Sequence, residues 1–434
     1  MKRHARYLAT LLGLLACFAW ARQQFAQQIA NRHVVRVGES LQSIAHTYQL
    51  SPETLQVYNA LPSNVVYRGQ TLHIPPTDLQ LRLPSNPHPT LADFWAGTAE
   101  FVLELAQTGL PMGESDSFQL ANGEILSFYH ASERSAGVRD SCGEPVPFPG
   151  CVVQVQSTDG GRTFSQPHTC QFTCRTCPCT SWGDQIDQQQ YPRIATDGQA
   201  WAMVYEYRGG TMLRQSSDGI RWGRAQLLLN SGMWNADYRP CPPLFSMNSH
   251  PLLDEADCLM GGPPGVWVEG GIVYLFVGFG SNPGQMGCWK LAAGADISLA
   301  IRCNQSPLFV GSSTYGDLAV QGASANPYFD FRHITSAEVS KVGEHYYLLY
   351  EGTRGPEVGQ SGIDPFGLGL ARSVGSEIDG AWEVFSGNPI LVNHPGNIGV
   401  GHADLLTLDG ITYLYTSLDG VTRQRLQLVW KIIP

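Results

Sequence analysis

A hairpin pattern recurs five times after about residue 100 of this 434-residue chain. Each copy has an apolar strand, a turn that contains glycine and a second strand rich in aromatic residues, as in "RIATDGQAWAMVYEY" and "EVSKVGEHYYLLYEG". Glycine between runs of Val, Ile, Leu, Tyr and Phe is typical of β-hairpins. The turn glycines, spaced by 75, 72, 73 and 67 residues, are Gly123, Gly198, Gly270, Gly343 and Gly410.

Five similar units of about 70 residues predict a mainly β fold, a five-bladed β-propeller. Radial closure would protect the edges of so many strands. A sandwich of two sheets is the alternative, but it would not need near-equal spacing. The 43% of hydrophobic residues can fill a large core, and the 47 glycines and 28 prolines suit short strands joined by turns.

A second pattern follows several of the hairpins. It reads "STDGGRTF" at residues 157–164, "SSDGIRW" at residues 216–222 and, more loosely, "ARSVGSEIDGAW" ending at Trp382. Its Asp side chain can accept hydrogen bonds from backbone amides across the turn, while the aromatic residue packs between sheets. The pattern resembles the sialidase-type Asp-box, and we expect it to be structural rather than catalytic.

The charge and the motifs exclude several classes of function. A net charge of −10 argues against nucleic acid as a partner, because phosphate binding needs clustered Lys and Arg. The sequence has no Walker loop, no GxSxG elbow and no HExxH motif. We expect a monomer.

The N-terminus predicts export. A basic head, "MKRHAR", precedes the fifteen-residue apolar run "YLATLLGLLACFAWA", which is short of the about 20 residues that span a bilayer. Residues 1–30 are therefore a signal peptide cleaved after Ala21, a lipoprotein signal with Cys17 lipidated, or an uncleaved anchor. All three alternatives place the rest of the chain in the cell envelope or outside the cell as a secreted protein.

Without Cys17, ten cysteines remain, an even number that suits disulfides in an exported chain. The cluster "CQFTCRTCPC" at residues 170–179 could bind zinc through its thiolates, but export favours two disulfides there. The local pairs that we expect are Cys142 with Cys151, Cys241 with Cys258, and Cys288 with Cys303.

Residues 33–76 read as a small domain with the order strand, helix, helix, strand. Ser40 and Ser51 are placed to cap the two helices. The segment resembles the LysM module in Gly38-Glu39-Ser40-Leu41, Ile44-Ala45, Leu55, Asn59 and the run 69–75, "GQTLHIP".

This resemblance implies a βααβ LysM domain that binds glycans containing N-acetylglucosamine, such as peptidoglycan or chitin. Leu41 and Leu61 could instead serve packing alone. A single module binds weakly, since avidity comes from several copies. Residues 77–99, rich in proline, are predicted to be a linker to a propeller at residues 100–434. The groove that the resemblance implies contains Gly38, Glu39, Ser40, Leu41, Leu61, Pro62 and Ser63.

The chemistry of a propeller lies where its innermost strands begin. We count back from the turn glycines, with one or two positions of slack. The aligned residues at the start of the inner strands are Asp116, Arg193, Gly265, Glu338 and Asp404. Three carboxylates and one arginine are therefore expected to converge at one mouth of the channel, where repulsion between carboxylates can raise the pKa of one of them.

This arrangement resembles the five-bladed propeller glycoside hydrolases of the arabinanase, xylosidase and fructosidase type, which use three acids. The resemblance implies Glu338 as general acid, Asp116 as base or nucleophile and Asp404 as the group that tunes the acid. The chain departs from the family on the second and third blades, where Arg193 and Gly265 replace the usual carboxylates. A structural Ca²⁺ ion bound by the acids is an alternative; otherwise no cofactor and no metal is expected.

Other polar residues would surround the acids. We expect Arg193 to hold a sugar hydroxyl or carboxylate and His402, in "GHADLL", to act as a hydrogen-bonding group. Glu351 and Arg354 end a second strand and could form a rim, although solvated turn charges are the alternative. Two long insertions, residues 231–262 and 311–333, are predicted to lie over the mouth.

Two hypotheses follow. One is an exported glycoside hydrolase that acts on a polysaccharide and is tethered to a cell-wall glycan by its LysM module. The other is a carbohydrate-binding or envelope scaffold propeller without catalysis. A sialidase is disfavoured, because it needs an arginine triad with a Tyr/Glu pair.

Overall fold

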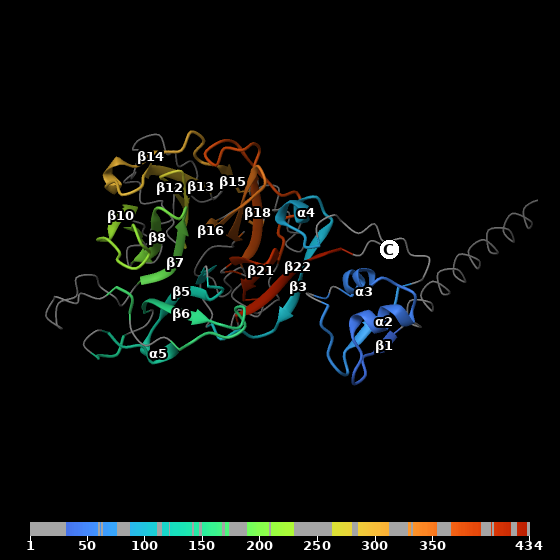
Figure 1. Ribbon diagram of the computed structural model, residues 1–434. Helices are drawn as coiled ribbons and strands as arrows, with labels where there is room; N and C mark the ends of the chain where they lie inside the picture. The colour runs from blue at the N-terminus through green and yellow to red at the C-terminus, as the bar shows by residue number, and fades with distance from the viewer. Residues whose placement is uncertain are drawn as a thin grey trace, which may run out of the picture. The chain divides into compact units, whose positions relative to one another are not determined.

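The protein is described from a computed structural model (Figure 1). It divides into two compact units, and each is treated by itself. Among the described residues, no helix is both long and apolar enough to cross a membrane. The N-terminal signal lies outside them, and so do the predicted insertions apart from a few residues at their ends. The described residues are 32–59, 61, 64–75, 87–110, 115–120, 122–140, 143–146, 150–166, 170–172, 189–207, 210–229, 263–279, 285–311, 329–330, 333–353, 366–391, 401, 403–417 and 423–431.

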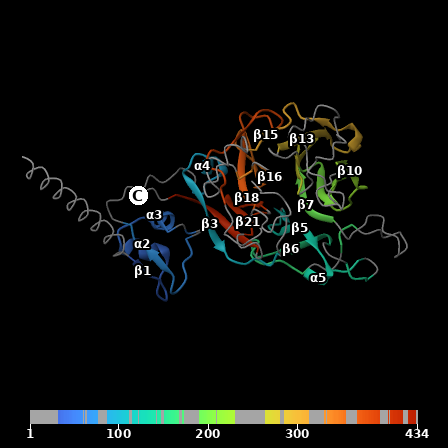
Figure 2. The same ribbon diagram turned by 180° about the vertical axis from the view of Figure 1, so that it is seen from behind.

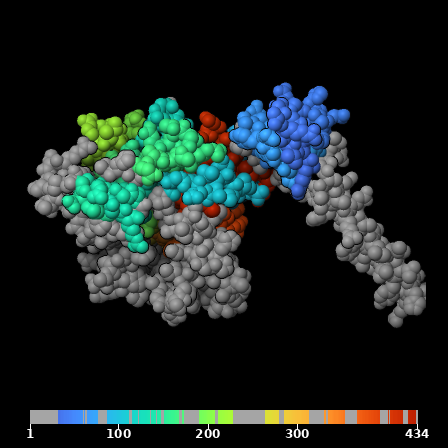
Figure 3. Space-filling model, turned by 90° about the horizontal axis from the view of Figure 1, so that it is seen from below, coloured from blue at the N-terminus to red at the C-terminus, as the bar shows by residue number. Residues whose placement is uncertain are grey.

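The N-terminal module has the predicted order of elements (Figure 2). They are β1 (Arg32–Val34), α2 (Leu41–Thr47), α3 (Pro52–Tyr58) and β2 (Thr71–His73). Ser40 caps α2, since its Oγ accepts a hydrogen bond from Ser43 N at 3.1 Å. Asn59 joins α3 to β2, because its amide donates to Leu55 O and His73 O. The blue residues in Figure 3 show the module as one compact body.

The larger unit is built almost entirely of strands. Its short helices are α4 (Leu91–Trp95), α5 (Glu133–Ala136) and the 3₁₀ turn η1 (Ile297–Leu299). Its strands are β3 (Ala99–Leu105), β4 (Ser115–Gln119), β5 (Ile125–Ala131), β6 (Cys151–Ser157), β7 (Gln189–Thr196), β8 (Trp201–Tyr207), β9 (Gly210–Ser216), β10 (Gln226–Leu229), β11 (Gly265–Glu269), β12 (Ile272–Phe279), β13 (Gln285–Ala292), β14 (Ile301–Arg302), β15 (Phe309–Val310), β16 (His333–Val342), β17 (His345–Thr353), β18 (Gly367–Ser373), β19 (Trp382–Val384), β20 (Asp404–Leu408), β21 (Ile411–Thr416) and β22 (Gln424–Trp430).

These strands form five antiparallel sheets arranged as the blades of a propeller, as the sequence predicts (Figure 1). The sheets are β4-β5-β6, β7 to β10, β11 to β15, β16 to β19, and β20-β21-β22-β3, which we call blades 1 to 5. The inner strands contact one another in the closed order β4, β7, β11, β16, β20 and back to β4. All five turn glycines have positive φ, between 58° and 86°, which glycine adopts without strain and a hairpin turn requires.

Strand β3 closes the ring. It precedes blade 1 in the sequence but pairs with β22 as the outer strand of blade 5. The first and last parts of the propeller therefore share one sheet, which covers an edge that would otherwise be exposed.

Apolar clusters join the blades, one at each of the five interfaces. Each cluster combines residues of two neighbouring blades, such as Phe128 with Met203 between blades 1 and 2. Burial at these interfaces is the main force that holds the ring, since buried apolar area contributes roughly 25 cal/mol per Å². The other pairs are Val204 with Val268, Phe276 with Leu348, Leu349 with Leu414, and Leu406 with Tyr129.

The turns after β6 and β9 have the predicted geometry. Asp159 Oδ1 accepts hydrogen bonds from Arg162 N at 3.0 Å and Thr163 N at 2.9 Å. Thr163 Oγ1 also donates to Asp159, and although partial burial opposes them, these hydrogen bonds lower the pKa of Asp159 to about 2. Phe164 is buried against Tyr415. The likeness of these turns to sialidase Asp-boxes stays an interpretation.

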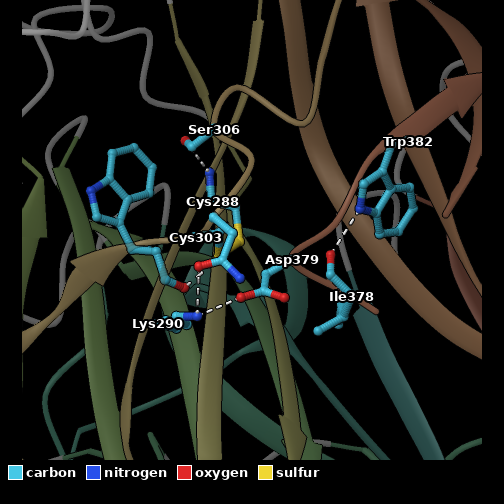
Figure 4. The surroundings of a disulfide bond; sticks show 9 residues. Cys288, Lys290, Cys303, Ser306, Ile378, Asp379 and Trp382 are labelled. Carbon is cyan, nitrogen blue, oxygen red and sulfur yellow. Dashed lines mark hydrogen bonds and ion pairs between the residues drawn. A yellow bond between two sulfur atoms is a disulfide. The ribbon is translucent and has the colours of Figure 1, made fainter. Parts of the chain in front are cut away.

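Two disulfides are present among the described cysteines, and one differs from expectation. Cys288 bonds Cys303 as predicted, beside the Lys290–Asp379 ion pair between blades 3 and 4 (Figure 4). The predicted partner of Cys151 was wrong, because Cys151 bonds Cys170.

The backbone explains this correction. Gln171 N donates to Val152 O at 2.7 Å, so the segment after the turn runs back along β6 and brings Cys170 opposite Cys151. A zinc site using all four thiols of residues 170–179 is therefore also wrong. The other predicted cysteine partners lie outside the described residues.

Candidate active site

The structure brings together the three acids that the hairpin alignment places at the start of the inner strands. Asp116 lies on β4, Glu338 on β16 and Asp404 at the first position of β20. One oxygen from each carboxyl group lies within 4.8 Å of the other two, and all three residues are at most 7% exposed. Residues about 290 positions apart therefore share one buried site in the channel.

Each acid is bonded to the next blade in the ring. Its carboxyl accepts a hydrogen bond from the backbone amide one position after the aligned residue of that blade. These hydrogen bonds join blade 1 to blade 2, blade 4 to blade 5, and blade 5 to blade 1. They run to Asp116 Oδ2 from Ile194 N, to Glu338 Oε1 from Leu405 N at 3.4 Å, and to Asp404 Oδ1 from Ser117 N at 3.1 Å.

Blades 2 and 3 carry Arg193 and Gly265 at the aligned positions. Gly265 has a steric reason, because a Cβ there would lie 2.4 Å from both Ala337 O and Ala337 Cβ on β16. Strand β11 can approach β16 this closely only with glycine. Gly265 is therefore a packing residue and supplies no functional group.

Arg193 is 1% exposed and contacts three other inner-strand groups. Its Nη1 donates to Ser115 O at 2.7 Å and lies 3.0 Å from Glu338 Oε2, and its Nη2 donates to Ser336 Oγ at 3.3 Å. These contacts give Arg193 a positioning role for Glu338. The expectation that it holds a sugar group stays a prediction.

Matched irregularities precede the two members of this ion pair. The register of β7 shifts between Gln190 and Arg193, and that of β16 shifts between Thr335 and Glu338. Each shift contains a non-glycine residue with positive φ, Tyr191 at 54° and Ser336 at 55°. Such bulges redirect the following side chains, and strained backbone of this kind clusters at functional sites.

Both carboxyl oxygens of Asp404 accept hydrogen bonds from residues of blade 1. Its Oδ2 accepts from Ser115 Oγ and Ser117 Oγ, both at 2.8 Å, and Arg423 Nη2 donates to Ser115 Oγ at 2.7 Å. The sequence reasoning missed these two serines and Arg423. The alternation "SDS" around Asp116 was an available signal, since residues two apart share one face of a strand.

Burial governs ionisation in this site. It raises the pKa of Glu338 well above its ordinary value; the guanidinium of Arg193 opposes the shift, and the charges of Asp116 and Asp404 add to it. Burial also raises the pKa of Asp404, against the charges of Arg423 and Arg193. A raised pKa favours the protonated form of Glu338, which a general acid needs.

As pH rises, we expect the free energy of unfolding of the wild-type protein to fall relative to that of the Glu338→Gln variant. The folded state holds the Glu338 proton more tightly than the unfolded chain, whose pKa is about 4.3. The stabilisation that the Glu338 carboxyl contributes is therefore complete below about pH 4.3, and it is lost as pH rises through the raised pKa of the folded state. Urea unfolding at about pH 4 and about pH 8 measures it.

Asp159→Asn is the control, since the pKa of Asp159 is lowered to about 2, so its contribution is nearly complete at pH 4 and does not fall as pH rises. Parallel curves of unfolding free energy against pH for wild type and Glu338→Gln would contradict the expectation.

The remaining predicted site residues are placed as follows. Glu351, on β17, is 4% exposed, and a Cβ on Gly401 would lie 2.6 Å from its Oε1, so it is buried beside Gly401 rather than solvated. His402 and Arg354 lie outside the described residues.

In the module, Pro62 and Ser63 also lie outside the described residues. Leu41, 1% exposed, belongs to the core, and Leu61 packs against it, which supports packing for both. Gly38 has φ 86° and lies next to Glu39. A hydrogen bond from Arg36 N at 2.7 Å, then one with His33, lowers the pKa of the half-buried Glu39.

Comparisons with known proteins found one family model and several solved structures that are similar to this chain. Residues 33–75 match the family model of the LysM domain, and they form such a domain. The chain is similar in structure to a glycosyl hydrolase from Bacteroides ovatus, with 14% identity, a TM-score of 0.45 and coverage of 76% of this chain and 89% of that one. It is also similar to an exo-1,5-alpha-L-arabinanase from a bovine ruminal metagenomic library, with 13% identity, a TM-score of 0.41 and coverage of 77% and 100%. No curated protein matches in sequence.

Proposed function

We propose that the protein is an exported glycoside hydrolase that acts on a polysaccharide at the cell envelope. The observation that carries the proposal is the buried cluster of Asp116, Glu338 and Asp404, in which the pKa of Glu338 is raised. Glycosidic cleavage needs one protonated and one ionised carboxyl group near the bond.

In this mechanism Glu338 protonates the glycosidic oxygen as the bond to the anomeric carbon breaks. Asp116 attacks that carbon and forms a glycosyl-enzyme ester. Water then loses a proton to Glu338 and attacks the same carbon, the bond to Asp116 breaks, and the sugar is released. The carboxyl oxygens, within 4.8 Å, are nearer to the about 5–5.5 Å of retaining enzymes than to the about 6.5–9.5 Å of inverting ones. Asp404, held by blade 1, tunes the acid, because its charge adds to the raised pKa of Glu338.

The test is the release of reducing sugar from a panel of plant, fungal and bacterial polysaccharides by the full chain. Release from at least one polysaccharide is expected. Binding of polysaccharide with no product from any of them would favour the second candidate, a carbohydrate-binding propeller without catalysis. The bonds from each acid to the next blade support that alternative, because they give the carboxyls a structural task.

The LysM domain is proposed to hold the protein on peptidoglycan or chitin. An envelope or extracellular location is consistent with this domain and with the disulfides. A monomeric state, the predicted domain borders and the signal segment stay predictions.

Removing residues 32–75 should lower the fraction of protein retained on insoluble peptidoglycan or chitin by at least about tenfold, because the LysM groove supplies the contact. Sedimentation with each glycan measures this. The shortened chain should keep the thermal unfolding transition of the propeller and its cleavage of soluble substrate. Equal retention of both proteins would contradict an anchoring role.

A further inference from the structure

A cavity of about 200 Å³ lies in the propeller channel, and we call it the channel cavity. Its wall is polar at one end and aromatic at the other. The polar end has Asp116, Arg193 and Glu338, and the aromatic end has Phe118, Trp201 and Trp267.

The channel cavity extends from the acids toward the hairpin turns of the blades. Asp116 is the second residue of β4 and Glu338 is the sixth of ten in β16, whereas Thr196 and Trp201 flank the turn between β7 and β8. Thr196 also lines the cavity and is exposed. The cavity therefore reaches the surface on the face of the hairpin turns, opposite the face where the inner strands begin.

The chemistry of the wall matches one sugar ring. The volume equals that of about seven water molecules, enough for a monosaccharide and too small for a disaccharide. Aromatic rings contact the apolar C–H face of a sugar, and carboxyl groups bond its hydroxyls. With Glu338 protonated, the charges of Asp116 and Arg193 in the wall balance each other, which favours a neutral ligand.

We propose that the channel cavity binds one neutral monosaccharide, which enters from the hairpin-turn face and reaches Asp116 and Glu338 from that side. The choice of a sugar rests on the proposed function, but binding here does not need cleavage.

The experiment is saturation-transfer NMR of the full chain with glucose, galactose, xylose, arabinose and N-acetylglucosamine, each tested alone. At least one sugar is expected to bind with a Kd of about 1–10 mM. Thr196→Trp, which fills the opening, and Trp267→Leu, which removes part of the aromatic end, should each weaken that binding at least tenfold. Trp222→Leu, which alters a partly buried tryptophan outside the cavity, should leave it unchanged.

Two results would overturn the inference. One is no saturation transfer with any sugar; the other is binding of equal strength in wild type, Thr196→Trp and Trp267→Leu, which would place the sugar elsewhere, such as on the LysM domain. Cleavage is measured separately. A chain that cleaves polysaccharide but binds no single sugar refutes this inference alone, and a chain that binds the sugar but cleaves nothing refutes only the proposed hydrolysis.

Discussion

Glu338→Gln and Asp116→Asn should each lower the rate of sugar release by about 10²–10⁴-fold or more. The glutamine cannot donate the proton that the leaving oxygen needs, and the asparagine cannot act as an ionised base or nucleophile. Both changes keep the shape of the side chain, and both amide oxygens can still accept the hydrogen bonds from Leu405 N and Ile194 N. The measurement is kcat on the best polysaccharide of the panel.

Asp330→Asn is the matched control. Asp330 is also a buried acid, 3% exposed, but it accepts a hydrogen bond from Tyr350 OH at 2.7 Å and does not line the channel cavity. Its replacement should change kcat by less than about threefold. Activity that survives in Glu338→Gln and Asp116→Asn would contradict the assignment of these residues, as would an equal loss in Asp330→Asn.

The anomeric form of the first released sugar tests the spacing of the acids. Carboxyl oxygens within 4.8 Å predict retention, which NMR observes as initial release of the same anomer as in the substrate. Initial release of the opposite anomer would require the acid and the base to be another pair of groups.

Aligning the five hairpins on their turn glycines found the three acids that the structure brings together, because the count starts at the turns. Asp116, Glu338 and Asp404 are each five to seven residues before their turn glycine, and the strand between is regular. The bulges in β7 and β16 lie on the other side of Arg193 and Glu338, so they did not disturb the count. The number of residues between a turn glycine and the acid that precedes it can be read directly from a sequence.

The contacts that organise the site were not visible in the same way. Bonds such as that from Ser117 N to Asp404 join residues 287 positions apart and depend on the twist and spacing of neighbouring blades. The pairing of β3 with β22 and the bond between Cys151 and Cys170 also depend on how segments pack, which the hairpin pattern does not show. Hairpin patterns specify each blade, whereas the packing of the ring decides which polar groups meet between blades.

At a pH high enough to ionise Glu338, Arg193→Gln should lower the free energy of unfolding by about 3–5 kcal/mol, the cost of breaking a buried ion pair. Arg193 is 1% exposed, and its loss would leave Glu338 with a like charge on either side and no cation at 3.0 Å. The double variant Arg193→Gln with Glu338→Gln should recover a large part of the loss, because the uncompensated buried carboxylate is then absent. Urea unfolding at about pH 8 and about pH 4 measures all three variants, and the loss in Arg193→Gln should be smaller at about pH 4, where Glu338 is protonated.

The surface pair Arg221–Asp218 supplies the control, since Arg221 Nε lies 2.9 Å from Asp218 Oδ2 but the Arg221 side chain is 88% exposed. Arg221→Gln should cost only about 0–1 kcal/mol. A similar small cost for Arg193→Gln, or no recovery in the double variant, would show that Arg193 does not govern Glu338. If the expected pattern is found, the same pair explains why the matched bulges of β7 and β16 persist: the strain at Tyr191 and Ser336 is offset by an ion pair that only this backbone path can form.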